Sequence, residues 1–435
     1  MKRFTLILGL ITIGLFSCES PNYPEKIYND NPDVLPDPVI TSIAPADSAF
    51  AGIGILTITG ENFGSDINRC QIYFNGNPGE IQSLSATELV VKAPNLVADS
   101  VKIQISVIGA YEFAEWDNYK LFPAVVSWGG FDPLGTNLWA IAIDNSENLF
   151  VSESENREIL RVFPNGEADS VTFAAHSAKQ KAIGMRYYAA NSSLILAMSH
   201  KNIYEVDEGN DANNIVRLPS NTRAYDLDFD SYGNMYAGGR RNVLYRINLG
   251  AGESSFTSAV TFPDDVHLNA IRVFEDYVYV IGEYIGSDTT AVLYGIYRTA
   301  IVSSDSLGPV ELLLDWEAAL GADATKPFDL TFALDGTLIV GVDYIDPSSL
   351  ASLGPALYKV SPPYADATPE PIYAEVLPAP ATKLTWGNNN YLYVNSRNTA
   401  TVPDGASWDY NPVNYKGLFR VDMTKQGAPY YGRTN

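Results

Sequence analysis

The chain has 435 residues and a formal net charge of −23, which argues against binding nucleic acid or an anionic membrane surface by charge. Aromatic residues make up 12% of the sequence and charged residues only 18%, and long helical patterns are absent. This composition favours an all-β protein.

The N-terminus has the pattern of a secretion signal. Lys2 and Arg3 precede an apolar run over residues 4–16, which is shorter than the ~20 residues that a membrane span needs. The run ends in a serine followed by Cys18, and this ending resembles the lipobox of bacterial lipoproteins. The resemblance implies that residues 1–17 are a signal peptide and that Cys18 carries lipid; the alternative is an ordinary signal peptide with a chance cysteine. The lipid is then the expected membrane attachment.

A tether is predicted over residues 18–37, which are rich in Pro, Asn and Asp and hold few apolar side chains that could pack. Cys70 is the only other cysteine in the chain. If Cys18 is lipidated, an intramolecular disulfide is excluded.

Residues 38–123 are predicted to form one small β-sandwich. Short segments of alternating apolar residues follow one another at regular spacing, and Asn75-Gly76 is a strong hairpin signal. These segments are 53–58, 71–74, 89–92 and 101–107.

The same region resembles the IPT/TIG family, whose fold is immunoglobulin-like. The most specific match is Leu-Thr-Ile-Thr-Gly-Glu-Asn-Phe-Gly at residues 56–64. Further matching stretches are 38–45, 72–76 and 89–94. The resemblance implies a fold rather than a function, and we expect a rigid spacer that holds the next domain away from the membrane.

Residues 124–435 repeat a pattern of apolar strand, tight polar turn, second strand and third strand. Clear copies begin at 140, 225 and 328, and weaker copies begin at 183, 270 and 383. A spacing of about 40–60 residues fits a four-stranded propeller blade. The turns resemble those of NHL-type propellers, so a six-bladed β-propeller is predicted. Residues 124–127 are expected to supply the fourth strand that the last blade lacks after Met423.

A ligand site is predicted on the propeller face that bears the loops after the second strands, because long loops gathered on one face are usually functional. Aromatic side chains there could stack on sugar rings, and charged side chains could bind hydroxyl groups. The predicted stacking residues are Tyr284, Tyr344, Trp408 and Tyr410, and the predicted polar contacts are Asp343, Arg240 and Arg397.

Other aromatic and basic residues are interpreted as structural. Trp139 and Trp386 lie in predicted inner strands and are expected in the core, whereas the position of Trp316 is left open. Four arginines at matching positions after second strands could form a ring over the central channel, but solvated or paired side chains are favoured. These four are Arg157, Arg240, Arg241 and Arg397.

No cofactor or metal is expected. The histidines, at positions 176, 200 and 267, have no metal-ligand spacing, and no catalytic triad signature or phosphate loop is present. Asp226, Asp228 and Asp230 faintly resemble a calcium loop, but repeat-turn chemistry explains them better. A carboxylate pair for glycoside hydrolysis stays open, because many acidic residues could converge.

A lipoprotein with an IPT-like spacer and a C-terminal ligand domain resembles the surface glycan-binding proteins of Sus-like polysaccharide uptake systems. The resemblance implies an outer-membrane, cell-surface location and non-catalytic capture of a polysaccharide beside a glycan transporter and its lipoprotein partner. The alternatives are a propeller lyase or glycoside hydrolase, and a protein-interaction scaffold.

Overall fold

The structure is a computed structural model. It describes residues 34–131, 136–176, 181–250, 255–321, 325–343, 355–374, 376–377, 380–396 and 417–433. Within these ranges no helix is both long and apolar enough to cross a membrane. The predicted signal peptide, Cys18 and most of the predicted tether lie outside the described residues.

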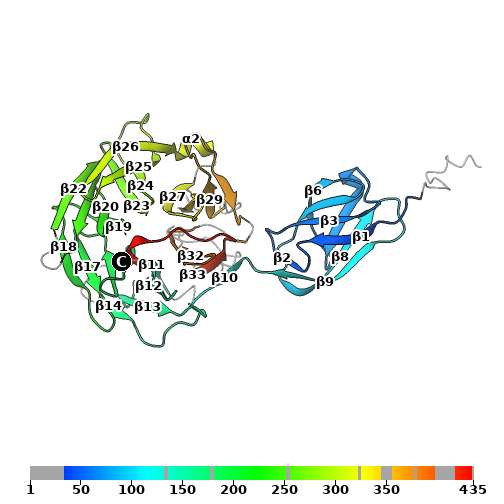
Figure 1. The fold of residues 1–435 in the computed structure, drawn as a ribbon, viewed down its shortest axis with the longest axis horizontal. Helices are drawn as coiled ribbons and strands as arrows, with labels where there is room; N and C mark the ends of the chain where they lie inside the picture. Colours follow the sequence, from blue (N-terminus) through cyan, green and yellow to red (C-terminus); the bar gives the residue numbers. More distant parts are fainter. Residues whose placement is uncertain are drawn as a thin grey trace, which may run out of the picture. The chain divides into compact units, whose positions relative to one another are not determined.

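The N-terminal strands form an immunoglobulin-like sandwich of two sheets (Figure 1). The four-stranded sheet has the order β1 (Val39–Ala44), β3 (Ile55–Glu61), β7 (Glu88–Lys92) and β6 (Glu80–Leu84). The five-stranded sheet has the order β2 (Ser48–Phe50), β9 (Ala114–Phe122), β8 (Ala98–Val107), β4 (Cys70–Phe74) and β5 (Asn77–Pro78). A short 3₁₀ helix, η1 (Ile67–Arg69), precedes β4.

Apolar residues that alternate with polar ones along the strands form the core of this sandwich, as the sequence predicts. Leu56 and Ile58 of β3 are fully buried, and so are alternate residues of β8. Asn75 and Gly76 have φ angles of 48° and 81° and connect β4 to β5, so the predicted hairpin is confirmed. Cys70 is a buried free cysteine, and burial raises the pKa of its thiol to about 11.

The remaining strands form six four-stranded sheets that stand around a common centre (Figure 1). The first blade comprises β11 (Leu138–Ile143), β12 (Leu149–Glu153), β13 (Glu158–Val162) and β14 (Ala174–Ala175). The second comprises β15 (Gly184–Tyr188), β16 (Ser193–Ala197), β17 (Asn202–Val206) and β18 (Asn213–Arg217). The third comprises β19 (Ala224–Phe229), β20 (Asn234–Gly239), β21 (Val243–Asn248) and β22 (Ser255–Thr261). The next two are β23 (Val266–Phe274), β24 (Tyr277–Tyr284), β25 (Tyr294–Ser303) and β26 (Ser306–Asp315); and β27 (Lys326–Phe332), β28 (Leu338–Asp343), β29 (Leu357–Val360) and β30 (Glu370–Ile372). The sixth is β31 (Lys383–Trp386), β32 (Tyr391–Ser396), β33 (Gly417–Asp422) and β10 (Val125–Ser127), and the short helices are α2 (Trp316–Leu320) and η5 (Tyr431–Arg433).

The ring closes as predicted. β10 pairs antiparallel with β33, with Val126 opposite Arg420, and supplies the fourth strand of the last blade. The first strand of each blade contacts the first strand of the next, and β31 contacts β11. The predicted six-bladed β-propeller is therefore confirmed, and its six inner strands surround the centre of the ring.

The repeat-turn interpretation holds for Asp230 but is wrong for Asp226 and Asp228, which are buried strand residues of β19. One carboxylate oxygen of Asp144 accepts hydrogen bonds from the backbone N–H groups of Ser146 and Asn148. Asp230 caps the turn of the third blade in the same way, through Tyr232 and Asn234. Asp144 and Asp230 are turn residues because their side chains satisfy backbone donors that the two-strand hairpin leaves unpaired.

Candidate functional site

The C-terminal segment crosses one end of the propeller centre. Its backbone pairs with two opposite blades, the fifth through Leu334 N–H to Gln426 O and the second through Ala189 N–H to Gly432 O. The C-terminus accordingly lies near the middle of the ring (Figure 1). A cavity in the propeller centre is therefore backed by protein on this side.

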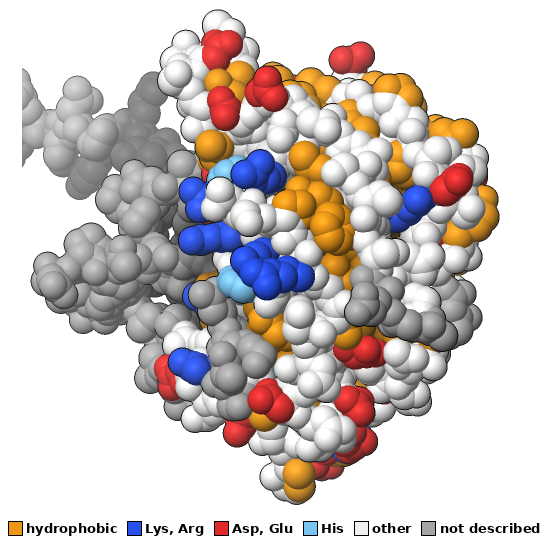
Figure 2. All heavy atoms as spheres, turned by 90° about the vertical axis from the view of Figure 1, so that its left-hand side faces the viewer, with side chains coloured by type: hydrophobic (Ala, Val, Ile, Leu, Met, Phe, Trp, Pro, Cys, Tyr) orange, Lys and Arg blue, Asp and Glu red, His pale blue; other side chains and the backbone are white. Residues whose placement is uncertain are grey.

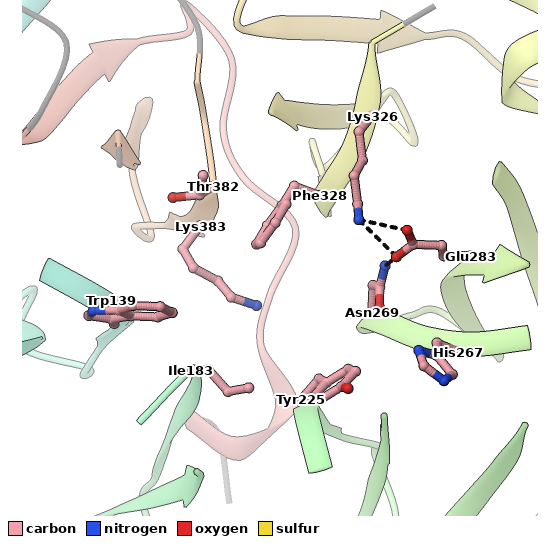
Figure 3. Close-up of a pocket in the computed structure, with 10 residues that line it drawn as sticks. All are labelled: Trp139, Ile183, Tyr225, His267, Asn269, Glu283, Lys326, Phe328, Thr382 and Lys383. Carbon is pink, nitrogen blue, oxygen red and sulfur yellow. Dashed lines mark hydrogen bonds and ion pairs between the residues drawn. The ribbon is translucent and has the colours of Figure 1, made fainter. Parts of the chain in front are cut away.

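A cavity of about 280 Å³ lies at the other end of the inner strands. Every blade contributes a residue that is in, or directly before, its first strand, and the end of β24 adds a carboxylate (Figure 3). The lining residues are Trp139, Ile183, Tyr225, His267, Asn269, Glu283, Lys326, Phe328, Thr382 and Lys383. This is the face on which the sequence predicts the site, but the cavity lies at the centre of that face.

β-Bulges aim several of these side chains into the cavity. The pairing of inner and second strands skips one residue at Tyr225, at Asn269 and at Phe328. The pairing of β11 with β12 is likewise interrupted between Leu138 and Ile141, where Trp139 lies. Bulges redirect side chains and are frequent beside functional sites, so four blades use the same device to build one pocket.

Aromatic side chains form part of the wall. Trp139, Tyr225 and Phe328 are each half-buried and come from three different blades (Figure 3). The ring of Tyr225 meets His267 edge-on with centroids 6.2 Å apart, and the ammonium of Lys181 lies 3.3 Å from the centre of the Trp139 ring. The wall therefore combines flat apolar surfaces with a cation, which suits a ring-shaped polar ligand.

An ion pair between two blades forms the opposite wall. The Lys326 ammonium donates to both oxygens of Glu283, at 2.7 and 2.9 Å, and the Asn269 amide donates to Glu283 Oε2 at 2.7 Å. Burial lowers the pKa of the adjacent His267 and raises that of Tyr225, so both side chains are neutral near pH 7. Glu283 is the one carboxylate among the ten lining residues, and its charge is already compensated.

Lys383 points into the cavity from β31 (Figure 3). Its side chain is only 9% exposed. The nearest carboxylate oxygens, on Asp226 and Asp329, lie 3.9 and 4.0 Å from its nitrogen, beyond hydrogen-bonding distance. Among the described residues Lys383 has no hydrogen-bond acceptor for its ammonium protons.

A buried ionic cluster lies beneath Lys383. Asp226 and Asp228 accept hydrogen bonds from backbone N–H groups of β23, and they face the guanidinium groups of Arg186 and Arg272. Asp329 accepts from Leu384 N–H in the same manner, and burial raises the pKa of its carboxyl. The carboxylates thus join the inner strands of neighbouring blades, which is why two of them alternate along β19.

The predicted site residues are only partly placed. Arg240 is exposed and lies near Tyr225 and His267, close enough to influence both electrostatically. Tyr284 is half-buried beside the cavity residue Glu283, and its hydroxyl accepts from Asp288 N–H at 3.0 Å. Asp343 is buried at the end of β28, opposite Lys326 in the strand pairing. The remaining four lie outside the described residues; they are Tyr344, Arg397, Trp408 and Tyr410.

Of three tryptophans considered in the sequence, two lie in the core and one lines the cavity. Trp316 and Trp386 are fully buried, whereas Trp139 is half-buried and lines the cavity. The expectation that Trp139 is a core residue is wrong, because the bulge in β11 breaks the alternation on which it rests. Arg157, Arg240 and Arg241 are exposed, so solvated or paired side chains fit them better than a ring that lines the channel.

None of the ten residues that line the cavity is among the seven predicted site residues. Ile183, His267, Asn269, Lys326, Phe328, Thr382 and Lys383 are all close to the start of a repeat. Alignment of the six repeats on their first strands would have placed these residues together. No group of His, Cys, Asp or Glu in the described part of the chain could hold a metal ion.

The fold and this cavity define the C-terminal part as a six-bladed propeller with a central cavity. Residues 38–120 match the IPT/TIG domain family, which confirms the predicted family of the sandwich. Comparison with curated proteins gives no match.

Solved structures similar to this chain include two from Bacteroides thetaiotaomicron. One is named as a candidate phosphatase (11% identity, 89% of this chain and 97% of that chain, TM-score 0.53). Another is an auxiliary nutrient binding protein (13% identity, 90% and 98%, TM-score 0.47), and a third is virginiamycin B lyase from Staphylococcus aureus (10%, 62% and 80%, TM-score 0.43). At these identities the likeness concerns the fold alone.

Proposed function

We propose that this protein is a cell-surface lipoprotein that captures a polysaccharide without cleaving it, and that the propeller cavity binds the glycan. The observation that carries the proposal is the cavity itself: aromatic walls from three blades and convergent polar groups, backed by the C-terminal segment. Its volume of about 280 Å³ is near the lower end for ligand pockets and suits one sugar unit at a chain end.

The side chains fit the chemistry of a sugar. Trp139 and Phe328 offer flat faces to the C–H groups of the ring, and such contacts contribute ~1 kcal/mol or more each. Asn269, Thr382 and Lys383 offer donors and acceptors for hydroxyl groups. The predicted loop residues, among them Trp408 and Tyr410, would extend the same face with contacts to further sugar units.

The composition of the cavity favours binding over hydrolysis. Glycoside hydrolases need two carboxyl groups that flank the scissile bond, roughly 5–10 Å apart. Glu283 is the single carboxylate among the cavity residues, and Lys326 and Asn269 already occupy it.

A lyase is the second candidate, because one observation favours it. Neutral His267 lies beside Tyr225, and this pair could accept a proton from a sugar carbon and return one to the leaving oxygen. Such a reaction would release unsaturated products, which distinguishes it from binding.

The rest of the chain would hold this site at the cell surface. In the proposal, lipid on Cys18 anchors the protein in the outer membrane, residues 18–37 are a tether, and the sandwich over residues 38–123 is a spacer. A glycan transporter and its lipoprotein partner would receive the polysaccharide.

A glycan panel tests capture against cleavage. We expect purified protein to be retarded in gels that contain one of the polysaccharides, with no new reducing ends and no absorbance of unsaturated products after prolonged incubation. Product release would contradict non-catalytic capture and establish the lyase or a hydrolase.

Anchoring is tested separately with Cys18→Ala. Without the thiol there is no site for the lipid, so we expect this variant to leave the membrane fraction, whereas the wild type stays there after a carbonate wash. Cys70→Ala is the matched control, because Cys70 is buried in the sandwich, and it should remain in the membrane fraction. A Cys18→Ala protein that still sediments with membranes would refute the lipobox interpretation.

A further inference from the structure

The ammonium of Lys383 is the least satisfied polar group of the cavity. It has three donor protons, is nine-tenths buried, and has no acceptor within hydrogen-bonding distance among the described residues. A buried charge without hydrogen bonds is costly, so a ligand that supplies oxygen acceptors here gains more than it would at an exposed lysine.

Lys383 differs from Lys326, the other lysine that lines the cavity, because its nearest carboxylates lie beyond hydrogen-bonding distance. Lys326 is neutralised by Glu283, whereas Asp226 and Asp228 below the cavity are already compensated by Arg186 and Arg272. Asp329, the remaining carboxyl near Lys383, lies 4.0 Å from the Lys383 nitrogen and accepts a hydrogen bond from Leu384 N–H. Lys181 adds a second cation at the face of the Trp139 ring.

A basic arc continues from the cavity across blades two and three. We define it as Lys201, Arg217, Arg223, Arg240 and Arg241, which lie at the loop ends of β16, β18 and β20. Backbone hydrogen bonds join these loops, from Leu218 N–H to Lys201 O and from Arg240 N–H to Arg223 O.

The arc is unusual for so acidic a chain. None of its five cations forms an ion pair with a carboxylate in the part of the chain that the structure describes, although the net charge is −23. Figure 2 shows Lys and Arg side chains gathered beside histidines on the side where β17, β18 and β22 lie in Figure 1. Carboxylates lie nearby in the chain, since Asp264 and Asp265 directly precede β23, the first strand of the next blade.

We propose that the polysaccharide is acidic: its terminal sugar places a carboxylate or a sulfate group against Lys383, and the following acidic units cross the basic arc. This inference rests on the proposed binding function. The C-terminal segment closes one side of the cavity, so the cavity admits only the end of a polysaccharide. The basic arc is the continuous run of unpaired cations next to the cavity in the described residues, and it sets the direction in which the rest of the polysaccharide runs. Trp139 and Phe328 hold the sugar ring between them.

The test uses the full chain and tetragalacturonic acid, the same tetrasaccharide after reduction of its carboxyl groups, and a sulfated chondroitin tetrasaccharide. Calorimetry should show binding of one or both acidic probes and at least about tenfold weaker binding of the reduced probe. Binding of the chondroitin probe without binding of tetragalacturonic acid would assign the contact to the sulfate, because chondroitin carries both groups, whereas binding of tetragalacturonic acid shows that a carboxylate suffices. Raising the salt concentration from about 0.05 to about 0.5 M should weaken acidic-probe binding further.

Two variants locate the effect. Lys383→Met removes the buried ammonium, and Arg223→Gln with Arg240→Gln removes two cations of the arc without touching the core. Each should weaken the acidic probe at least about tenfold, and the double variant should also reduce the salt dependence. The control is Arg298→Gln with Lys425→Gln, which removes one half-buried and one exposed cation outside the arc, and it should bind as the wild type does.

The outcomes separate this inference from the proposed function. If the reduced probe or a neutral polysaccharide binds as tightly as the acidic probes, the ligand is neutral, and the inference fails while glycan capture stands. If no polysaccharide or oligosaccharide binds, the proposed function fails as well. Equal losses in the arc variant and in the control variant would also overturn the inference, because the effect would then be one of net charge.

Discussion

Arg272→Met is expected to destabilise the propeller by about 3–5 kcal/mol. The Arg272 side chain is fully buried, and its Nη1 donates to Asp228 Oδ2 and to Val273 O, both at 2.8 Å. Its guanidinium also lies 3.5 Å from the centre of the Tyr430 ring and donates to the backbone of the C-terminal segment. Methionine fills a similar volume but removes one of the partners of the buried Asp228 carboxylate. The loss of stability arises mainly because a buried charge is then left uncompensated.

Chemical denaturation followed by tryptophan fluorescence measures this loss, with the propeller transition analysed apart from that of the sandwich. Arg298→Met is the matched control, since it breaks an exposed pair with Glu311 and should change stability by less than about 1 kcal/mol. Adding Asp228→Asn to Arg272→Met should recover part of the loss, because the uncompensated charge is gone. Equal stability of the two single variants would show that the cluster does not hold the blades together.

Trp139→Ala is expected to weaken glycan binding at least about tenfold while leaving the fold intact. The indole forms one wall of the cavity, and losing its stacking surface removes ~1–3 kcal/mol of binding free energy. Because Trp139 is half-buried at the cavity and not in the core, its loss should cost far less stability than Trp386→Ala, which empties a fully buried site.

Calorimetry on Trp139→Ala and on Trp408→Ala compares the cavity with the predicted loop. If the cavity is the main site, Trp139→Ala gives the larger loss, and both variants keep the melting temperature of the wild type within a few degrees. A wild-type affinity for Trp139→Ala together with a large loss for Trp408→Ala would move the site to the loops over residues 397–416.

Repetition made the architecture predictable from sequence. Turn aspartates such as Asp144 and Asp230 mark the hairpins, and the apolar runs before them mark the inner strands. The pairing of β10 with β33 follows from a simple count: one strand was missing at the end of the last repeat, and one was left over before the first.

The central cavity was less predictable, because it depends on departures from that regularity. Tyr225, Asn269 and Phe328 point into the cavity only because each is the extra residue of a bulge, and a pattern of strict alternation assigns such residues to the opposite face. Lys383 has no local signal at all, since apart from Thr382 the other lining residues come from other blades. Arg240 is the predicted site residue that lies close enough to His267 to influence it electrostatically, and its role in binding stays a prediction.

A crystal structure of the full chain with tetragalacturonic acid, or with whichever acidic tetrasaccharide binds best, tests the central claim most directly. The account predicts a terminal sugar inside the cavity, its ring against Trp139 and Phe328, and an acidic oxygen within hydrogen-bonding distance of Lys383 Nζ. Sugar bound elsewhere on the propeller, with the cavity occupied by solvent alone, would contradict it.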